Sequence, residues 1–422
     1  MSMLVVEGGT PLEGGVYVHG AKNAALPILA ATVLGNGVSV VHNCPNITDV
    51  NAAVNILNHL GCRAFRDGDS VIVDSSDVCR WDIPESMMRE MRSSVMFLGA
   101  ILARCGKADI TYPGGCELGP RPIDLHLKAL EKLSIRIDEK LGRINCRACK
   151  ARGSEISLDM PSVGATENIM LAAVTAKGET VIVNAAQEPE IVDLQNFLNC
   201  MGAKIHGGGT NVITIQGVEQ LYGCEYTVIP DRIETVTYMA AAGITGGRLS
   251  INNVIPEHVQ AVASVMKCAG CDIMHGESRI DISAPPRLKS VDYIRTMPYP
   301  GFPTDAQAII MAMLSVSQGV SVFSENIFSG RFKHVPALTM MGANIITEGR
   351  TAIVRGVNRL YGASVKAEDL RGAAALVVAA LNAEGKTEIS GINYLDRGYC
   401  NLENALSSVG ANIYRCKKEN EI

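Results

Sequence analysis

One short pattern recurs six times along the chain, and it limits the possible folds more than any other feature of the sequence. In five of the six copies a helix-like segment is followed by glycine, a small residue, any residue and an apolar one, as in "HLGCRA", "CMGAKI" and "SVGANI", and the second copy departs with serine. Neighbouring copies lie 68 to 73 residues apart, so that six similar units fill the 422-residue chain. A fixed period of this kind is typical of a repeat architecture. The repeat position is occupied by Gly61, Ser134, Gly202, Gly270, Gly342 and Gly410.

Each unit has the same predicted order of elements. A β-rich segment such as "VSVVHN" comes first, and an amphipathic helix follows that ends at the repeat glycine, which indicates a helix C-cap. A hairpin comes next, and its second strand alternates as in "NVITIQG". The unit continues into a helix that is apolar on nearly all sides, for example "AQAIIMAMLSVSQG". Because such a helix is a buried one, we expect an α/β fold with three of these helices in the middle of each domain and sheets outside.

The length and the two chain ends predict how the units are grouped. A single core rarely grows beyond about 250–300 residues, so a chain of 422 residues predicts two domains of three units each. The sixth unit lacks its second hairpin strand because the chain ends at Ile422, and the N-terminal "MLVVEGG" resembles that strand. We therefore expect one domain over residues 21–229 and a second domain made of residues 1–20 and 230–422, closed by the N-terminal strand.

Composition excludes several classes of protein. The net charge of −5 argues against binding nucleic acid through bulk charge. The N-terminus lacks a basic region followed by an apolar core, and no apolar run reaches the roughly 18 residues that cross a bilayer. With 13 cysteines and no export signal, the chain is expected in a reducing cytoplasm. The spacing of the pairs Cys146/Cys149 and Cys268/Cys271 suits zinc, but one pair falls in a predicted strand and the other across a helix end, so we expect no metal site.

Charged or polar residues stand where the apolar helices begin. Helix N-termini carry about half a positive charge and unpaired N–H groups, and they therefore attract anions. One interpretation is that each such residue only caps its own helix, which suits Asp231 and Asp369. It suits Lys22, Arg92 and Arg371 poorly, because a cation at a helix N-terminus is unfavourable without an anion nearby. If these helix starts face one cleft, a phosphate or a carboxylate is the expected ligand.

The stretch "PGGCELGPRP" places Cys116 on a glycine-rich turn five residues before Arg121. A structural cysteine prefers apolar neighbours, and this one has almost none. A nearby guanidinium group favours the thiolate and makes the sulfur reactive. Further arginines occupy comparable loops of later units, Arg331 in "SGRFKHV" and Arg397 in "YLDRGY". We therefore expect a reactive thiol beside a group of arginines that binds an anion.

Taken together, these stretches resemble the enolpyruvyl transferase family, and within it the UDP-N-acetylglucosamine 1-carboxyvinyltransferases that begin peptidoglycan synthesis. The matching stretches span the chain and include "GAKNAALPIL", "PGGCELGPRPIDLH", "PSVGATENIM", "EPEIVD", "PDRIET", "PGFPTDAQA", "GRFKHVPAL", "DLRGAAALV" and "DRGY". The resemblance implies two domains, each an inside-out α/β barrel of three units, in agreement with the repeats. It also implies transfer of the enolpyruvyl group of phosphoenolpyruvate to the 3′-hydroxyl of UDP-N-acetylglucosamine, with release of phosphate and without a metal or organic cofactor.

The resemblance further implies a role for each candidate residue. Cys116 would donate a proton to phosphoenolpyruvate, and Asp305 would position or deprotonate the sugar hydroxyl, although a plain helix cap would look the same in the sequence. Lys22 and Arg121 would hold the phosphate, while three later arginines would hold the carboxylate. The residues expected to bind phosphoenolpyruvate are Lys22, Asn23, Arg121, Arg331, Arg371 and Arg397. Those expected to bind UDP-N-acetylglucosamine are Asn23, Arg92, Arg121, Pro122, Ile123, Asp124, Leu125, Asp305 and Ile327.

The sequence departs from the family at one point and leaves two other functions to consider. Met160 and Pro161 precede "SVGAT", where some family members have a lysine set to meet the diphosphate. A shikimate-3-phosphate enolpyruvyl transferase is one alternative, against which the cysteine loop and "RPIDLH" argue. A non-catalytic paralogue that senses UDP-sugar is the other, against which the retention of Cys116, Asp305 and the arginines argues.

The resemblance completes the expected properties of the protein. We expect a cytoplasmic monomer that acts on these small molecules and binds neither nucleic acid nor membrane. It would serve cell-wall biogenesis, and with it cell shape and division, and fosfomycin would alkylate it at Cys116.

Overall fold

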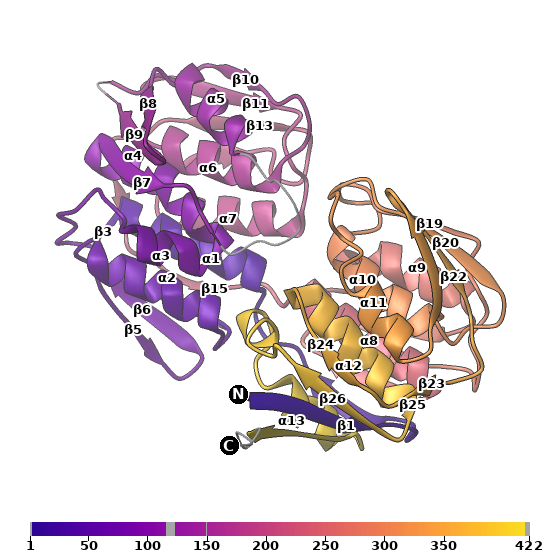
Figure 1. Cartoon of the computed structure of the whole chain (residues 1–422). Coiled ribbons are helices and arrows are strands. Elements are labelled where there is room, and N and C mark those ends of the chain that lie inside the picture. The colour runs from indigo at the N-terminus through magenta and orange to yellow at the C-terminus, as the bar shows by residue number, and fades with distance from the viewer. Residues whose placement is uncertain (1, 115–122, 149, 418–422) are drawn as a thin grey trace. The chain divides into compact units, whose positions relative to one another are not determined.

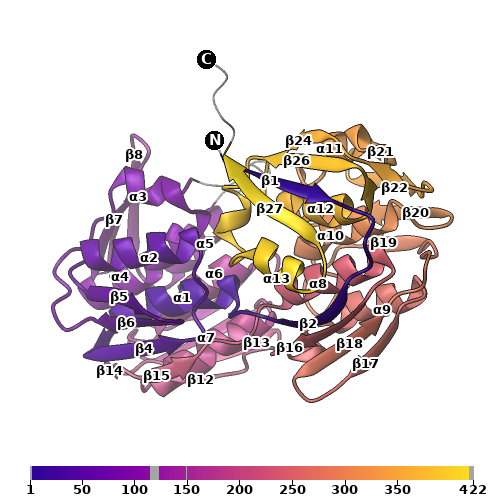
Figure 2. The same cartoon turned by 90° about the horizontal axis from the view of Figure 1, so that it is seen from below.

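The computed structural model describes residues 2–114, 123–148 and 150–417 (Figures 1 and 2). These residues form two compact units. The first unit lies within residues 20–229, and the second unit contains residues 2–19 and 230–417. In the part of the chain that is described, no helix has both the length and the apolar character needed to cross a membrane.

Six helices that are buried along nearly their whole length form the centres of the two units. In the first unit these are α1 (Lys22–Ala31), α4 (Phe97–Cys105) and α6 (Val163–Ala173), and α4 is preceded by the 3-10 helix η2 (Arg92–Met96). In the second unit they are α8 (Arg232–Thr245), α10 (Thr304–Leu314) and α12 (Leu370–Asn382). The predicted buried helices are therefore confirmed.

Small residues on these helices let their backbones approach closely. Gly99 of α4 illustrates the point, because an added Cβ there would lie 2.5 Å from the carbonyl oxygen of Asn168 in α6. In the second unit α8, α10 and α12 pack against one another, side by side in Figure 1. The alanine- and glycine-rich composition of these segments is thus what allows three helices to share one centre.

Shorter helices and antiparallel hairpins surround the inner helices of the first unit. The remaining helices here are α2 (Thr48–His59), α3 (Glu85–Glu90), α5 (Asp124–Lys132), α7 (Pro189–Cys200) and η1 (Thr32–Leu34). One four-stranded sheet has the strand order β15 (Glu225–Thr227), β4 (Val38–His42), β6 (Ser70–Asp74), β5 (Arg63–Asp67). A second four-stranded sheet has the order β10 (Glu155–Ser157), β11 (Glu179–Val183), β13 (Val212–Gln216), β12 (Lys204–His206). The smaller sheets are β7 (Lys107–Thr111), β9 (Arg143–Arg147), β8 (Arg136–Lys140), and the pair β14 (Leu221–Tyr222) and β3 (Gly35–Asn36).

The second unit repeats this arrangement. Its other helices are η3 (Pro256–Val259), α9 (Gln260–Cys268), α11 (Val335–Met340), η4 (Leu395–Arg397) and α13 (Leu402–Ser408). One sheet has the strand order β17 (Asp272–His275), β18 (Arg279–Ser283), β16 (Arg248–Asn252), β2 (Glu13–Tyr17). Another has the order β19 (Tyr293–Arg295), β20 (Val320–Ser324), β22 (Thr351–Arg355), β21 (Asn344–Glu348). The others are β24 (Ser364–Lys366), β26 (Lys386–Ser390), β1 (Ser2–Glu7), β27 (Asn412–Lys417), and the pair β23 (Leu360–Tyr361) and β25 (Ala383–Glu384).

The N-terminal strand β1 stands where the sixth repeat lacks its own strand. In the sheet before it, β20 pairs with β22 and β22 with β21. In the last sheet β26 pairs with β1 and β1 with β27, both antiparallel, so that Val5 lies opposite Glu388 on one side and Tyr414 on the other (Figure 2). The burial of Met3 to Val6 on both faces of the sheet is typical of a central strand.

The repeat glycines follow the ends of the outer helices and have left-handed backbone angles. Their φ values run from 94° at Gly342 to 105° at Gly202, and this confirms the helix C-cap predicted for them. Ser134 has a φ of 63°, so a residue with a Cβ occupies the left-handed position in the second repeat. Non-glycine residues are disfavoured there. Ser134 is therefore a local weak point of the first unit.

We predict that Ser134→Gly stabilises the first unit by about 0.5–1 kcal/mol, because it removes the cost of a Cβ at positive φ. The reverse change at the matching position, Gly202→Ser, should destabilise by about 1 kcal/mol or more, since its new Cβ has space but a strained backbone. Urea unfolding followed by circular dichroism measures both changes. Equal unfolding midpoints for the two variants would refute the backbone argument.

We also predict that deletion of residues 1–9 destabilises the second unit, because it removes the central strand of a sheet. Leu4→Ala should cost about 2–5 kcal/mol, since this buried side chain leaves a cavity. Ser2→Ala, on an exposed position of the same strand, should change stability by less than about 0.5 kcal/mol. Thermal unfolding tests the series, and a deletion variant that unfolds like the full chain would contradict this function of β1.

Candidate functional site

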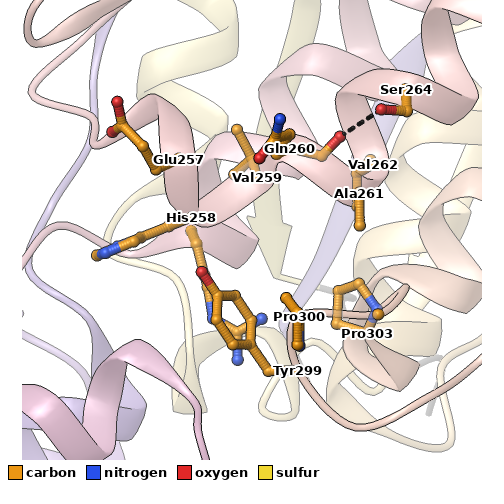
Figure 3. Close-up of a pocket in the computed structure, with 12 residues that line it drawn as sticks. Glu257, His258, Val259, Gln260, Ala261, Val262, Ser264, Tyr299, Pro300 and Pro303 are labelled. Atoms are coloured by element: carbon orange, nitrogen blue, oxygen red, sulfur yellow. Dashed lines mark hydrogen bonds between the residues drawn. The ribbon is translucent and has the colours of Figure 1, made fainter. Parts of the chain in front are cut away.

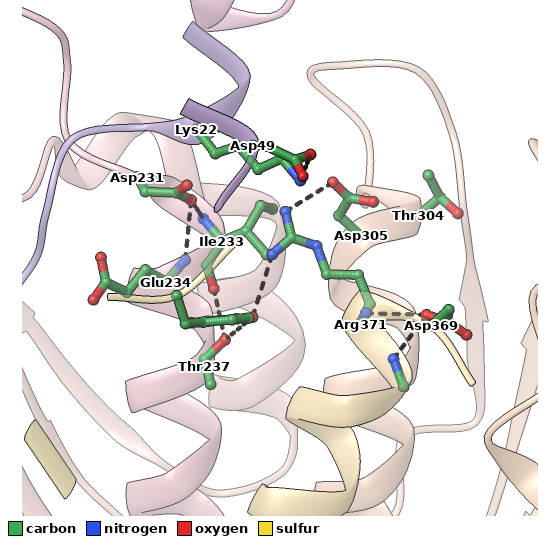
Figure 4. Close-up of polar contacts among 12 residues, drawn as sticks. Lys22, Asp49, Asp231, Ile233, Glu234, Thr237, Thr304, Asp305, Asp369 and Arg371 are labelled. Carbon is green, nitrogen blue, oxygen red and sulfur yellow. Dashed lines mark hydrogen bonds and ion pairs between the residues drawn. The ribbon is translucent and has the colours of Figure 1, made fainter. Parts of the chain in front are cut away.

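The three inner helices of the second unit begin with aspartates and arginines. Asp231 caps α8, and its Oδ1 accepts hydrogen bonds from the amides of Ile233 (2.7 Å) and Glu234 (3.1 Å). Asp369 caps α12 in the same way through the amides of Arg371 (3.0 Å) and Gly372 (2.9 Å). The capping interpretation of these two aspartates is confirmed (Figure 4).

Asp305 lies in the first turn of α10 but does not cap it. The N-cap is Pro303, without a side-chain hydrogen bond. Instead Asp305 Oδ1 accepts from Arg331 Nη2 at 2.5 Å and Oδ2 accepts from Arg371 Nη2 at 3.2 Å. The plain-cap alternative for Asp305 is therefore wrong, and the sequence could not show this because both ion partners are distant along the chain.

The two arginines are among the most buried charges of the second unit. Their side chains are 3% (Arg331) and 4% (Arg371) exposed, whereas that of Asp305 is 27% exposed. Arg331 also donates from Nε and Nη2 to the carbonyl oxygen of Thr304, at 3.2 and 3.1 Å. Two buried guanidinium groups thus share one carboxylate within ion-pair distance, and the charge of Asp231 also acts on Arg371. Clustered guanidinium groups of this kind can bind a carboxylate or a phosphate.

The electrostatics of Asp305 follow from these neighbours. Burial by itself would raise the pKa of its carboxyl group, but the guanidinium groups of Arg371, Arg331 and Arg232 outweigh that effect and hold the pKa well below its usual value. Burial would lower the pKa of Arg371, and the charge of Asp305 reverses this and raises it. Asp305 is therefore ionised near neutral pH and is a weak base in this state.

Glu325 helps to position the ion-paired cluster of Asp305, and the sequence analysis did not name it. Glu325 is buried at the end of β20 and accepts at Oε1 from the amides of Ile327 (2.8 Å) and Phe328 (3.0 Å). Its Oε2 accepts from the Thr304 hydroxyl at 2.9 Å. Glu325 thus links the segment that contains Ile327 and Phe328 to Thr304, the first residue of α10. A carboxylate directly after an apolar strand was the signal available in "VSVFSEN".

Arg397 ends the 3-10 helix η4 and is half-buried. Two residues later Tyr399 is buried and lies beside Arg371, with its hydroxyl 3.3 Å from Nη1. Tyr399 was not predicted either, although it stands in the quoted "DRGY". An aromatic residue in a short loop gives no sequence signal that separates packing from function.

In the first unit, Lys22 is the first residue of α1 and is buried. Its Nζ lies 2.8 Å from Oδ2 of Asp49 in the first turn of α2. The sequence predicts a phosphate or carboxylate ligand near Lys22, and in this structure the carboxylate of Asp49 stands beside it (Figure 4). Asn23 follows in α1 and is half-buried.

Arg92 begins η2, and its charge affects the pKa of His126 in α5. Burial and the charge of Arg92 lower the pKa of His126 to about 4, so its ring is neutral near pH 7. His126 Nδ1 therefore accepts from Asn168 Nδ2 at 2.9 Å, and this amide also donates to the Val95 carbonyl at 3.0 Å. The histidine of "RPIDLH" thus attaches α5 to α6 and to the segment before α4.

The other candidates of the first unit fall around α5 and α6. Ile123 is buried before α5, Leu125 is half-buried, and Asp124 Oδ2 lies 3.7 Å from Lys128 Nζ. Met160 and Pro161 precede α6, and Met160 is exposed. Cys116, Arg121 and Pro122 lie outside the described residues.

A pocket of about 330 Å³ lies in the second unit between the start of α9 and the loop before α10 (Figure 3). Its lining includes His258, Gln260 and Tyr299. Arg232 also lines it, with its guanidinium 5.8 Å from the ring centroid of Tyr299, and is the residue that the pocket shares with the charge cluster of Asp305. No residue predicted from the sequence lines this pocket, so the ion-paired cluster rather than the pocket is the candidate site.

Comparison with known proteins gives the family. The family profile described as EPSP synthase (3-phosphoshikimate 1-carboxyvinyltransferase) matches residues 6–406. UDP-N-acetylglucosamine 1-carboxyvinyltransferase 2 of Caldanaerobacter subterraneus subsp. tengcongensis is 53% identical over 98% of this chain and 100% of its own length. UDP-N-acetylglucosamine 1-carboxyvinyltransferase 1 of Symbiobacterium thermophilum is 51% identical over 97% of this chain and 94% of its own length.

Solved structures share the fold. The enolpyruvyl transferase NikO from Streptomyces tendae has a TM-score of 0.88 at 24% identity, over 98% of both chains. EPSP synthase from Acinetobacter baumannii has a TM-score of 0.75 at 18% identity, over 99% of this chain and 100% of that chain. The predicted α/β fold class of six repeated units is confirmed. The chain belongs to the EPSP synthase (3-phosphoshikimate 1-carboxyvinyltransferase) family.

Proposed function

We propose that the protein is an enzyme that transfers the enolpyruvyl group of phosphoenolpyruvate to the 3′-hydroxyl of UDP-N-acetylglucosamine. The observation that carries this proposal is that the relatives bearing this name are 45–53% identical over at least 97% of the chain. The shared carboxylate of Asp305 supports it, because a substrate with a carboxylate and a phosphate supplies the anions that two buried arginines attract.

The reaction needs a proton donor, a base and cations. The sugar hydroxyl oxygen adds to C2 of phosphoenolpyruvate while a proton adds to C3, which gives a tetrahedral intermediate. Loss of a proton from C3 and cleavage of the bond between C2 and the phosphate oxygen then release phosphate and leave the enol ether. We assign the proton donor to Cys116, the phosphate to Lys22 and Arg121, and the carboxylate to Arg331, Arg371 and Arg397.

Asp305 would position the sugar hydroxyl and take its proton. While Arg331 and Arg371 hold it, its pKa is too low for an effective base. Once the carboxylate of phosphoenolpyruvate engages those arginines, their hold on Asp305 weakens and its pKa rises. On this account the base becomes effective when phosphoenolpyruvate is bound.

The UDP-N-acetylglucosamine contacts of the proposal are assigned residue by residue. We assign them to Asn23, Arg92, Ile327 and the segment Arg121 to Leu125. With methionine and proline at positions 160 and 161, a diphosphate contact from that side is not part of the proposal. The two units would be the two domains, and the enzyme a cytoplasmic monomer in peptidoglycan synthesis.

The experiment is phosphate release from phosphoenolpyruvate with UDP-N-acetylglucosamine, measured beside the same assay with shikimate 3-phosphate. Release with the first acceptor alone is expected. Release only with shikimate 3-phosphate would assign the chain to the alternative transferase, and release with neither acceptor would contradict the enzyme proposal.

We predict that Cys116→Ser lowers kcat by about 10²–10⁴-fold, because a hydroxyl is a far weaker proton donor than a thiol in this position. Cys268→Ser, at an exposed cysteine that ends α9, should retain wild-type turnover. Circular dichroism checks that both variants stay folded. Wild-type phosphate release by a folded Cys116→Ser protein would refute the donor assignment.

A further inference from the structure

Behind Arg371 a short series of hydroxyl groups leads back to the neighbouring helix α8. Arg371 Nη1 lies 3.3 Å from the hydroxyl oxygen of Tyr399, and that oxygen lies 2.9 Å from Oγ1 of Thr237. All three side chains are buried. Arg371 and Thr237 come from different helices, α12 and α8, and Figure 4 shows them on either side of this contact.

One assignment of donors gives every group in this series a partner. Thr237 Oγ1 donates its only hydrogen to the carbonyl oxygen of Ile233, one turn earlier in α8, at 2.8 Å. With that hydrogen used, we assign the hydrogen between Tyr399 and Thr237 to the tyrosine hydroxyl. Burial raises the pKa of Tyr399, so it keeps this hydrogen near neutral pH. The free lone pair of the tyrosine oxygen is thus directed to Arg371, which can only donate.

Arg371 is held on three sides as a result. Arg371 donates from Nη1 to the Tyr399 hydroxyl oxygen and from Nη2 to Asp305 Oδ2. The centroid of the tyrosine ring lies 5.7 Å from the guanidinium carbon. A guanidinium carbon at this distance from an aromatic ring is attracted to it. The contacts with Tyr399 are separate from the ion pair with Asp305.

We propose that Tyr399, supported by Thr237, is a positioning residue that keeps Arg371 oriented for the carboxylate of phosphoenolpyruvate. This inference rests on the proposed function, in which Arg371 binds that carboxylate. It concerns the orientation of one guanidinium group, because bidentate recognition requires both terminal nitrogens to be fixed. Tyr399 itself contacts no substrate on this account.

The first test is Tyr399→Phe, which keeps the ring and removes the acceptor. The KM for phosphoenolpyruvate should rise about tenfold, as expected for a lost hydrogen bond to a charged group. The KM for UDP-N-acetylglucosamine should stay within about twofold, since only the carboxylate contact is affected. Tyr238→Phe is the matched control: its buried hydroxyl donates to Glu234 Oε1 at 2.8 Å from the same helix as Thr237. That variant loses a similar hydrogen bond, and its KM for phosphoenolpyruvate should remain that of the wild type.

The second test asks whether Thr237 acts through Tyr399. Thr237→Val removes the acceptor for the tyrosine hydrogen and should raise the same KM, whereas Thr237→Ser retains the hydroxyl and should restore the wild-type value. The double variant Tyr399→Phe/Thr237→Val should be no worse than Tyr399→Phe alone, because the two residues act in series. Effects that multiply in the double variant, or an unchanged KM in Tyr399→Phe, would overturn the proposal.

A measurement without turnover separates this inference from the proposed function. In arginine-labelled protein, the Nη hydrogens of Arg371, assigned by their loss in Arg371→Lys, should give separate NMR signals because rotation of the group is slow. In Tyr399→Phe they should average to one signal. Averaged signals in the wild type would refute the positioning of Arg371 even if the enzyme is active. Separate wild-type signals that average in Tyr399→Phe would support it even if phosphoenolpyruvate is not the substrate.

Discussion

Burying a helix on every side confines its polar chemistry to its ends, and this constraint shapes each unit of the molecule. The inner helices expose almost nothing along their length, so their N-terminal turns carry the caps and charges. In the second unit, those turns hold the ion pairs of Asp305 with Arg331 and Arg371. Under the proposed function, these two guanidinium groups bind the carboxylate of phosphoenolpyruvate.

Hydrogen bonds from neighbouring residues hold this group in place. Thr304 anchors Arg331 through its carbonyl oxygen and is itself tied to Glu325 through its hydroxyl. Tyr399 anchors Arg371 from the opposite side. Fixed donors reduce the reorganisation needed when charge arrives, which is how preorganised sites stabilise charged ligands and transition states. Under the proposed function, Asp305 pairs with the two arginines until the substrate carboxylate binds.

The repeat made much of the fold predictable from the sequence. Regular spacing of Gly61, Gly202 and Gly410 marked the helix ends, and unbroken apolar runs marked the inner helices, because both follow from local backbone and burial rules. Charged residues at helix starts could be found in the same way. Their partners could not, because Asp49 and Tyr399 meet Lys22 and Arg371 only after folding. Long-range ion pairs leave no periodic trace, so the sequence did not show that Asp49 stands beside Lys22.

The most direct test of the central claim is the affinity of phosphoenolpyruvate for a protein that cannot turn over. Calorimetric titration would use Cys116→Ser with saturating UDP-N-acetylglucosamine, with and without Arg371→Lys, which keeps the charge but loses the planar fork. Arg279→Lys, at an exposed arginine of β18, is the control. The account predicts binding at least about tenfold weaker with Arg371→Lys and unchanged with Arg279→Lys. Equal affinity in all three proteins would contradict it.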